Sequence, residues 1–552
     1  MITTPFSDEK TSASFIKNGF VTFPLLETEE LEVIRTLYQQ VNRLHELEQE
    51  QFYGVNYSLS SLPKHQNEEV MLKIKSLLDN YIARVCSDFE TFGFLFITKP
   101  ANTNREFVLH QDWCYTDEKS HAMPTCWIPL YDVDQSNGCL TIVKGSHTYF
   151  ETYRSESLAS ARIDIDSIPL EIREDVPLAA GSCCAFHQAS FHGSYPNKTD
   201  FSRPVLAFIA KHKLSPILYY VKKEKKVVAY QLSVAFFSEM LSQIPNSGLP
   251  PNEFAQTTFS YTEWLPTKQD LLISYRKSKP EHRLLKNQLM NDLFIEKGFI
   301  IIPNVLSQNA ITSLRVLYTS NFSTPQGMFV SHHSEREVAK NNAYSQQIFE
   351  SLQALYSQYF EDVRPLIAHF AVKAPGDAGL FNLHQDWSIV REELFGVAHC
   401  WIPLQDVSKT NGTLAVLPTS HLQFSNYRSG TCPIRFLPFG PFEELVQQIE
   451  VRAGDVVLYH PALFHGSLSN NSDTDRLAVV AAVAHPEATT AYHHNIAGDV
   501  WLYELLASDL YGRLDDLAKG EMPSGNQLGK LQYRILELTD AEIVETLKNN
   551  IN

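Results

Sequence analysis

Two short segments of the chain place a histidine and an aspartate two positions apart. The pairs are His110 with Asp112 and His384 with Asp386. Residues i and i+2 of a β-strand project from the same face, so each pair could chelate one metal ion. We therefore predict two metal sites, and each needs a further ligand from elsewhere in the chain.

A third ligand is expected from a later strand, and each half offers two histidines five residues apart. His192 follows the aspartate of its half by 80 residues, and His465 follows its aspartate by 79. His187 and His460 are the alternatives in the same two segments. Two histidines and one carboxylate on one face of an iron(II) ion leave coordination positions open, which is the arrangement of non-haem iron oxygenases.

An arginine follows each of the later histidines at the same distance. Arg203 and Arg476 lie eleven residues after His192 and His465, and each begins an apolar segment typical of a buried strand. A guanidinium group binds a carboxylate through two parallel hydrogen bonds, which lysine cannot do. These arginines therefore suit the distal carboxylate of 2-oxoglutarate, whose other end would occupy two of the open metal positions.

The repetition extends over nearly the whole chain. FIKNGF near the start is answered by FIEKGF, and YQL is answered by YEL. Three stronger motifs recur at an offset of 274 or 273, namely LHQDW at 109–113 and 383–387, CWIPL at 126–130 and 400–404, and FHGS at 191–194 and 464–467. The period predicts two whole domains, residues 1–285 and 286–552, joined in a polar stretch around residue 285.

Each half begins with helical periodicity and continues with short apolar runs. In the first half, apolar residues lie three or four apart within 28–51 and 61–85, and strand-like runs separated by turn residues follow after residue 90. This order predicts a mainly β fold with flanking α, in which a double-stranded β-helix (a cupin-like jelly roll) is repeated twice in tandem. A third helical passage is predicted near each end, over 230–244 and 501–519.

The composition limits the partners of the protein. Acidic residues outnumber basic ones by 63 to 46, giving a net charge of -17, so nucleic acid and anionic membrane surfaces are excluded as partners. No cationic leader or long apolar segment is visible, which predicts a soluble cytoplasmic protein without membrane insertion. The eight cysteines form no C-x-x-C pair, so we expect reduced, buried thiols and no zinc ribbon or disulfide scaffold.

The order of these motifs resembles that of the phytanoyl-CoA hydroxylase (phytanoyl-CoA dioxygenase) family of iron(II)- and 2-oxoglutarate-dependent oxygenases. The resemblance rests on HQDW, WIPL, Asn-Gly, a Ser-His turn, HGS and the arginine, and it covers residues 14–213 and 293–485. It implies iron(II), 2-oxoglutarate and O2 as cofactor and cosubstrates, with His192 and His465 as third ligands. The residues that it implies for the two 2-oxoglutarate pockets are Gln111, Trp127, Ser194 and Arg203, and Gln385, Trp401, Ser467 and Arg476.

We predict an Fe(II)/2-oxoglutarate-dependent dioxygenase that hydroxylates a small-molecule or lipid-derived metabolite, free or carrier-bound, at one or both sites. Aspartate in both triads favours hydroxylation over halogenation, because halogenating relatives have a small residue in that place. Two alternatives stay open: one catalytic half with a non-catalytic binding or scaffold half, and a non-oxidative cupin-type metal barrel. Trp113 and Trp387 would either line a substrate pocket or belong to the core.

Overall fold

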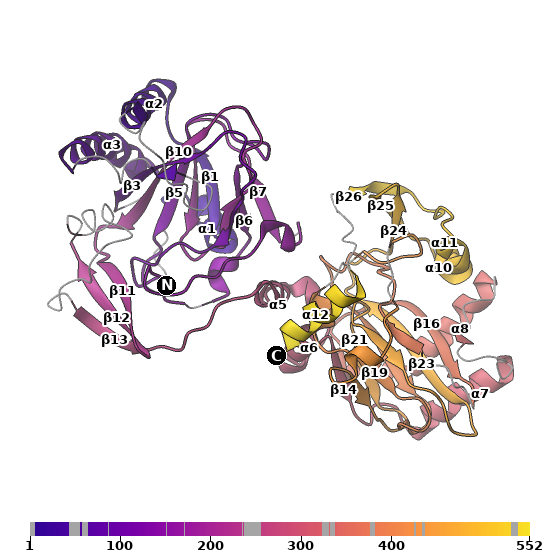
Figure 1. Cartoon of the computed structure of the whole chain (residues 1–552). Helices are drawn as coiled ribbons and strands as arrows, with labels where there is room; N and C mark the ends of the chain where they lie inside the picture. Colours follow the sequence, from indigo (N-terminus) through magenta and orange to yellow (C-terminus); the bar gives the residue numbers. More distant parts are fainter. Residues whose placement is uncertain are drawn as a thin grey trace. The chain divides into compact units, whose positions relative to one another are not determined.

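The chain forms two compact units, Met1–Leu271 and Leu272–Asn552, in the computed structural model (Figure 1). The polar stretch around residue 285, where the sequence places the domain boundary, therefore lies inside the second unit. The structure describes residues 6–43, 56–57, 64–86, 88–150, 152–170, 172–233, 236, 255–322, 330–331, 337–375, 381–423, 427–432, 436–531 and 539–551.

Two antiparallel sheets pack face to face in the first unit. In spatial order, the larger sheet contains β1 (Phe20–Pro24), β8 (Ser182–His187), β5 (Pro124–Pro129), β10 (Arg203–His212), β3 (Phe89–Lys99) and β2 (Asn56–Tyr57). The smaller sheet contains β4 (Phe107–His110), β9 (His192–Ser194), β6 (Leu140–Val143) and β7 (Arg173–Val176). Trp127, Phe186 and Val205 of the larger sheet share one buried cluster with Leu140 and Ile142 of the smaller sheet. The two layers therefore enclose a common apolar interior.

The second unit repeats this arrangement strand for strand. Its larger sheet contains β14 (Phe299–Ile302), β21 (Val456–Tyr459), β18 (Val397–Pro403), β23 (Arg476–Ala484), β16 (Arg364–Lys373) and β15 (Val330–Ser331). Its smaller sheet contains β17 (Phe381–His384), β22 (His465–Ser467), β19 (Leu414–Val416) and β20 (Gln447–Ile449). Trp401 and Val457 share a buried cluster with Leu414 and Val416 across the two layers. The predicted fold, a jelly roll repeated in tandem with flanking helices, is confirmed.

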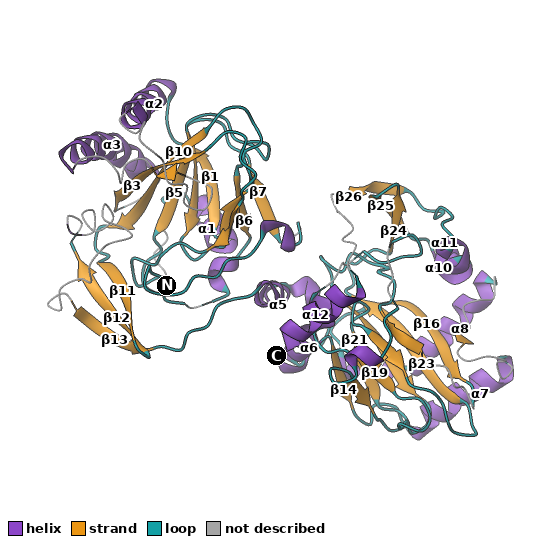
Figure 2. Cartoon of the chain, in the orientation of Figure 1, coloured by secondary structure: helices purple, strands orange, loops and turns teal. Residues whose placement is uncertain are grey.

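Helices cover the outer face of each larger sheet, as Figure 2 shows in purple. In the first unit, Ile34 and Leu78 of two helices are buried in one cluster with Phe96 and Phe208 of the sheet. The helices described in the first unit include α1 (Glu9–Asn18), α2 (Thr28–Arg43) and α3 (Lys64–Val85), and those of the second include α6 (Gln288–Lys297), α7 (Gln308–Asn321), α8 (Val338–Ser351), α9 (Gln353–Tyr359) and α12 (Asp540–Ile551). Short 3-10 turns lie at Ser146–Thr148, Ile165–Ser167, Pro280–His282, Ser420–Leu422 and Gly440–Phe442.

A glycine ends α1 and α6, which are equivalent helices of the repeat, and accounts for the glycine shared by FIKNGF and FIEKGF. Gly19 and Gly298 cap α1 and α6 with φ of 81° and 78°, a left-handed conformation that only glycine adopts without strain. A Cβ on Gly19 would lie 2.5 Å from Nδ1 of His147, and one on Gly298 would lie 2.5 Å from Nδ1 of His421. The backbone at each glycine therefore lies against the histidine of a Ser-His turn.

Replacing Gly298 by alanine should lower the free energy of unfolding of the second unit by about 1–3 kcal/mol, because the new Cβ combines backbone strain with a steric clash. Chemical denaturation followed by circular dichroism measures this difference. Gly440→Ala is the matched control, since no atom lies within 4 Å of the position of its Cβ. Equal denaturation midpoints for the two variants would contradict the expected strain.

A three-stranded sheet follows the jelly roll in each unit. The strands are β11 (Ile217–Lys223), β12 (Lys226–Leu232) and β13 (Ala255–Ser260), and then β24 (Ala491–Ile496), β25 (Asp499–Glu504) and β26 (Gln527–Leu531). The helices predicted from Tyr230 and from Trp501 were thus wrong at their starts, because both residues lie in strands. In the second unit, helices α10 (Ala507–Gly512) and α11 (Leu514–Ala518) follow the strand. In the first, residues 234, 235 and 237–244 lie outside the described part of the chain.

The helix α5 (Lys268–Ser278) fixes the polar boundary stretch to the second unit. Lys277 lies 2.5 Å from Glu296 and 3.9 Å from Asp292, both on α6. Arg276 is buried and interacts electrostatically with Glu392 and Glu393. These contacts explain why the unit begins before residue 285.

All eight cysteines are free and buried, and their burial is as expected from the sequence. Within the described ranges, no helix combines the length and apolar character needed to cross a lipid bilayer.

Candidate metal centre

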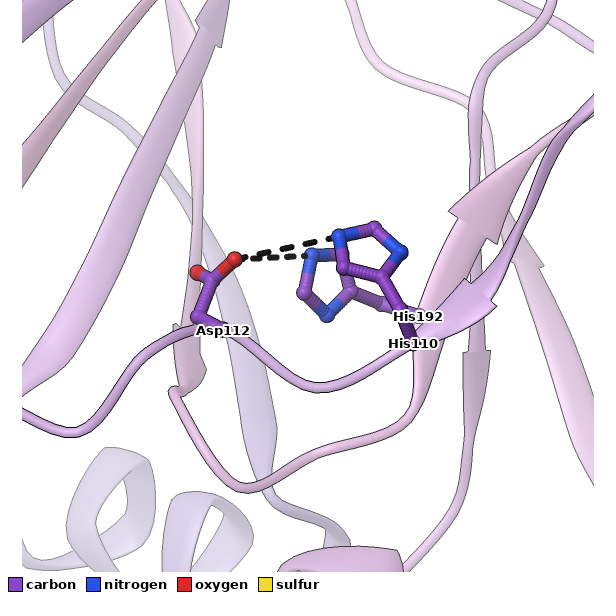
Figure 3. A group of neighbouring side chains, drawn as sticks. All are labelled: His110, Asp112 and His192. Carbon is purple, nitrogen blue, oxygen red and sulfur yellow. Dashed lines mark ion pairs between the residues drawn. The ribbon is translucent and has the colours of Figure 1, made fainter. Parts of the chain in front are cut away.

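The first histidine pair and its aspartate converge at the edge of the smaller sheet (Figure 3). His110 at the end of β4 and His192 at the start of β9 are direct cross-strand partners. Asp112 follows β4, and its Oδ1 lies 3.9 Å from Nε2 of His110 and 3.5 Å from Nε2 of His192. The three ligand atoms lie within 4.8 Å of one another, close enough to surround one ion.

Backbone contacts orient both imidazole rings of the first group. Nδ1 of His110 lies 2.9 Å from the carbonyl of Val108, and Nδ1 of His192 lies 3.0 Å from the carbonyl of Ser190. A carbonyl only accepts, so each ring donates its Nδ1–H to the backbone and directs Nε2 to the centre. Burial, aided by the neighbouring His192, lowers the pKa of His110 well below its usual value, which maintains the neutral form that metals require.

The second group has the same construction. His384 and His465 are cross-strand partners on β17 and β22, and their Nδ1 atoms lie 3.0 and 2.9 Å from backbone carbonyls. Nε2 of His384 lies 3.7 Å from Oδ1 of Asp386, and Nε2 of His465 lies 3.5 Å from Oδ2. Burial lowers the pKa of His465 to about 4. Although burial opposes ionisation of Asp386, the neighbouring His465 and His399 hold its pKa well below the usual value.

The competing histidines lie outside both groups. His187 and His460 accept hydrogen bonds at Nδ1 from backbone N–H groups two residues later, each at 3.1 Å, and so organise the turns after β8 and β21. His147 and His421 bond through Nε2 to backbone carbonyls near the ends of α1 and α6. Loop contacts therefore account for these four histidines.

A buried arginine and a buried lysine lie on neighbouring strands close to the first group. Arg203 and Lys99 are direct partners across β10 and β3, and both side chains are almost inaccessible to solvent. Nζ of Lys99 donates to the carbonyl and hydroxyl oxygens of Ser194 at 2.9 and 2.7 Å and to the carbonyl of Tyr195. Burial and the adjacent Arg203 lower the pKa of Lys99 to about 6, and burial lowers the pKa of Arg203 to about 10.

The arginine of this pair is poised to bind an anion. The guanidinium carbon of Arg203 lies 5.2 Å from the centre of the Trp127 ring. Its Nε is buried and has no hydrogen-bond partner, and no carboxylate pairs with it in the described part of the chain. A buried cation without a counter-ion is costly, and a bound carboxylate would remove that cost.

The second half reproduces this arrangement. Arg476 and Lys373 are cross-strand partners on β23 and β16. Nζ of Lys373 donates to the hydroxyl of Ser467 at 2.8 Å, and Arg476 lies 5.3 Å from the centre of the Trp401 ring. Nε of Arg476 is likewise buried without a partner. The serine, tryptophan and arginine implied for each 2-oxoglutarate pocket are therefore gathered in both halves.

The two glutamines implied for the 2-oxoglutarate pockets each donate to a backbone carbonyl. Gln111 donates from Nε2 to the carbonyl of Ala189 at 2.7 Å, and Gln385 donates to the carbonyl of Ala462 at 2.6 Å. These bonds hold the turn that leads to the third histidine. Gln111 also lines a cavity of about 240 Å³ together with Trp113.

Sequence reasoning missed two sets of residues. The lysines Lys99 and Lys373 recur at the offset of the repeat, each at the end of an apolar strand, which was the available signal. An arginine and a glutamate also recur: Arg154 donates from Nε to the backbone carbonyl of Asp112 at 2.8 Å and from Nη2 to Glu118 at 2.6 Å. The second half has the same bonds, made by Arg428 to the carbonyl of Asp386 at 2.8 Å and to Glu392 at 2.7 Å.

Comparison with known proteins finds one family twice in this chain. The family model described as Phytanoyl-CoA dioxygenase (PhyH) matches residues 21–205 and 294–478. Phytanoyl-CoA dioxygenase 1 of Oryza sativa subsp. japonica is 31% identical over 122 residues, 21% of this chain and 43% of the relative. Phytanoyl-CoA dioxygenase domain-containing protein 1 of Mus musculus is 30% identical over 218 residues, 38% of this chain and 65% of the relative. The chain thus spans less than two thirds of the length of these relatives.

Solved structures also resemble single halves of the chain. The epimerase SnoN, in complex with Fe3+, alpha ketoglutarate and nogalamycin RO, is 20% identical, covers 45% of this chain and 93% of its own, and gives a TM-score of 0.31. HygX from Streptomyces hygroscopicus with nickel and 2-oxoglutarate bound is 17% identical, covers 36% of this chain and 87% of its own, and gives a TM-score of 0.27.

Proposed function

Because the chain belongs to the phytanoyl-CoA dioxygenase (PhyH) family, we propose that it is an Fe(II)- and 2-oxoglutarate-dependent dioxygenase with one metal centre in each half. The predicted family, present as a tandem duplication, is confirmed by the two matches. The proposed iron ligands are His110, Asp112 and His192, and His384, Asp386 and His465. The proposed 2-oxoglutarate residues are Lys99, Trp127, Ser194 and Arg203, and Lys373, Trp401, Ser467 and Arg476.

One observation carries this proposal: two histidines and an aspartate converge in the same jelly roll as a buried arginine that has no carboxylate partner among the described residues. The metal group could bind the keto acid end of a cosubstrate, and the arginine could bind its distal carboxylate. A cupin-type isomerase would need the metal group alone. The buried Arg203 and Arg476 therefore favour the oxygenase over that alternative.

The side chains divide the work of catalysis. Iron(II), when bound, supplies the redox chemistry that couples decarboxylation of 2-oxoglutarate to oxidation of a substrate carbon. The histidines donate from Nδ1 to backbone carbonyls, and these bonds orient Nε2 of each ring toward the place of the ion. Arg203, which lies over the Trp127 ring, would bind the distal carboxylate, and Lys99 holds Ser194 in place. The buried setting of these groups excludes water and strengthens each charged contact.

The proposed substrate is a small metabolite, free or carrier-bound, and the proposed outcome is hydroxylation. Both halves retain the full set of groups, so we propose that both are catalytic. A half that serves only as a scaffold would have no need of a buried arginine that lacks a carboxylate partner among the described residues of its jelly roll.

The test is oxygen-dependent conversion of 2-oxoglutarate to succinate, measured after the protein has been loaded with iron(II) under anaerobic conditions. We expect slow turnover without substrate, complete loss when a chelator removes the metal, and recovery on addition of iron(II). A set of candidate metabolites, screened for faster succinate formation, would then identify the substrate class. Failure of the iron-loaded protein to consume any 2-oxoglutarate, together with failure to bind it, would refute the proposal.

A further inference from the structure

The aspartates of the two metal groups are held by different side chains. In the first half, Thr125 donates from Oγ1 to Oδ2 of Asp112 at 2.8 Å. In the second half, Nδ1 of His399 lies 2.8 Å from Oδ2 of Asp386, and the hydroxyl of Tyr459 donates to the same oxygen at 3.1 Å. An ionised carboxylate only accepts, so His399 contributes its Nδ1–H. Asp386 therefore has two donors on one oxygen, where Asp112 has one.

These side chains occupy matching positions in the two larger sheets. Thr125 on β5 is the cross-strand partner of Phe186 on β8. His399 on β18 is the cross-strand partner of Tyr459 on β21. The second half thus replaces a threonine and phenylalanine pair by a histidine and tyrosine pair, and both new polar groups meet at the aspartate.

The strand on the other side of His399 carries a smaller residue than its counterpart in the first half, which leaves room for the imidazole. Thr125 has Ile209 of β10 as its other neighbour, whereas His399 has Ala482 of β23. A larger residue on one strand is therefore matched by a smaller one on the next, which conserves the volume of the core. The core of the second unit therefore accommodates the side chain of His399.

The orientation of the carboxylate differs accordingly. In the first half, Oδ1 of Asp112 is the oxygen closest to both histidines. In the second half, each oxygen of Asp386 approaches a different histidine: Oδ1 lies closest to His384 and Oδ2 lies closest to His465. The two donors on Oδ2 thus set the rotation of the aspartate side chain.

We infer that His399 and Tyr459 are a positioning pair, which fixes the carboxylate of Asp386 and makes the second centre bind a divalent ion more tightly than the first. The inference rests on the proposed metal centres. Outer partners that orient a metal ligand change metal affinity by about 10–100-fold, since an oriented ligand loses less freedom on binding. The two halves are therefore non-equivalent at the metal itself.

The experiment is a cobalt(II) titration of the full chain, followed by visible absorption, which reports ligand geometry as well as binding. Asp386→Ala isolates the first centre, and Asp112→Ala isolates the second. We expect the dissociation constant of the second centre to be about 10-fold lower than that of the first. In the Asp112→Ala chain, adding Tyr459→Phe should raise the constant. The combination of His399→Thr, Tyr459→Phe and Ala482→Ile should shift both the cobalt(II) dissociation constant and the absorption spectrum of the second centre to those of the first.

Thermal unfolding of each metal-free variant shows whether the variant still folds. Phenylalanine at the position of Tyr459 is compatible with this fold, because Phe186 occupies the matching position in the first half. Equal constants for the two isolated centres, with a spectrum that the combined variant leaves unchanged, would overturn the positioning role. Absence of cobalt binding to both isolated centres would instead overturn the metal sites on which the inference rests.

Discussion

Asp112→Ala will bind one equivalent of iron(II) where the unaltered chain binds two, and Asp386→Ala will do the same. Each aspartate supplies the only negative charge among the three ligands of its group, so its loss leaves two neutral imidazoles. Without the charge of the carboxylate and its chelate geometry, the two remaining ligands bind a divalent ion much more weakly. Anaerobic titration with iron(II) and 2-oxoglutarate, followed by the weak metal-to-ligand charge-transfer absorption, counts the equivalents.

Asp117→Ala is the matched control, because this exposed carboxylate lies five residues from Asp112 and outside the metal group. It should leave both equivalents in place. A chain that binds one equivalent, lost in only one of the two triad variants, would show that the other half is a scaffold. That result would restore the single-site alternative.

Arg203→Leu will raise the dissociation constant of 2-oxoglutarate at the first centre by about 100-fold or more. The lost interaction is a pair of charged hydrogen bonds, each worth about 1.5–3 kcal/mol, and every 1.4 kcal/mol is about tenfold in affinity. The measurement is a 2-oxoglutarate titration in the Asp386→Ala chain, where only the first centre responds. Arg476→Leu in the Asp112→Ala chain should behave in the same way.

Arg203→Lys provides the comparison that separates charge from geometry. Lysine keeps the positive charge but cannot make two parallel hydrogen bonds, so the affinity should fall between those of the arginine and leucine proteins. Unchanged 2-oxoglutarate affinity in Arg203→Leu, with iron(II) still bound, would show that the anion pocket is elsewhere.

The histidine and aspartate pairs and the fold class could be predicted because their signals are local. His110 and Asp112 are two residues apart, and the FIKNGF motif encodes a helix, its glycine cap and a following strand within six residues. The duplication then confirmed each motif with a second copy. These features depend on neighbouring residues, which a sequence displays directly.

The supporting residues could not be predicted because their partners are distant in the chain. Lys99 meets Arg203 only through the pairing of β3 with β10, and Arg154 reaches the carbonyl of Asp112 across 42 residues. A buried lysine also contradicts the usual preference of that residue for the surface. The strand at Tyr230 was mistaken for a helix, because its pairing with Tyr219 is invisible in the local pattern.

The position of Arg276 on α5 determines where the chain can be divided. A second half that starts near residue 285, as the repeat suggests, would lack this buried cation and leave Glu392 and Glu393 without its positive charge. Glu392 holds Arg428, which in turn donates to the backbone of Asp386. A fragment cut there would therefore be damaged at its own metal centre, and inactivity of such a fragment would reflect the cut. Separate expression of the two halves requires a cut before α5.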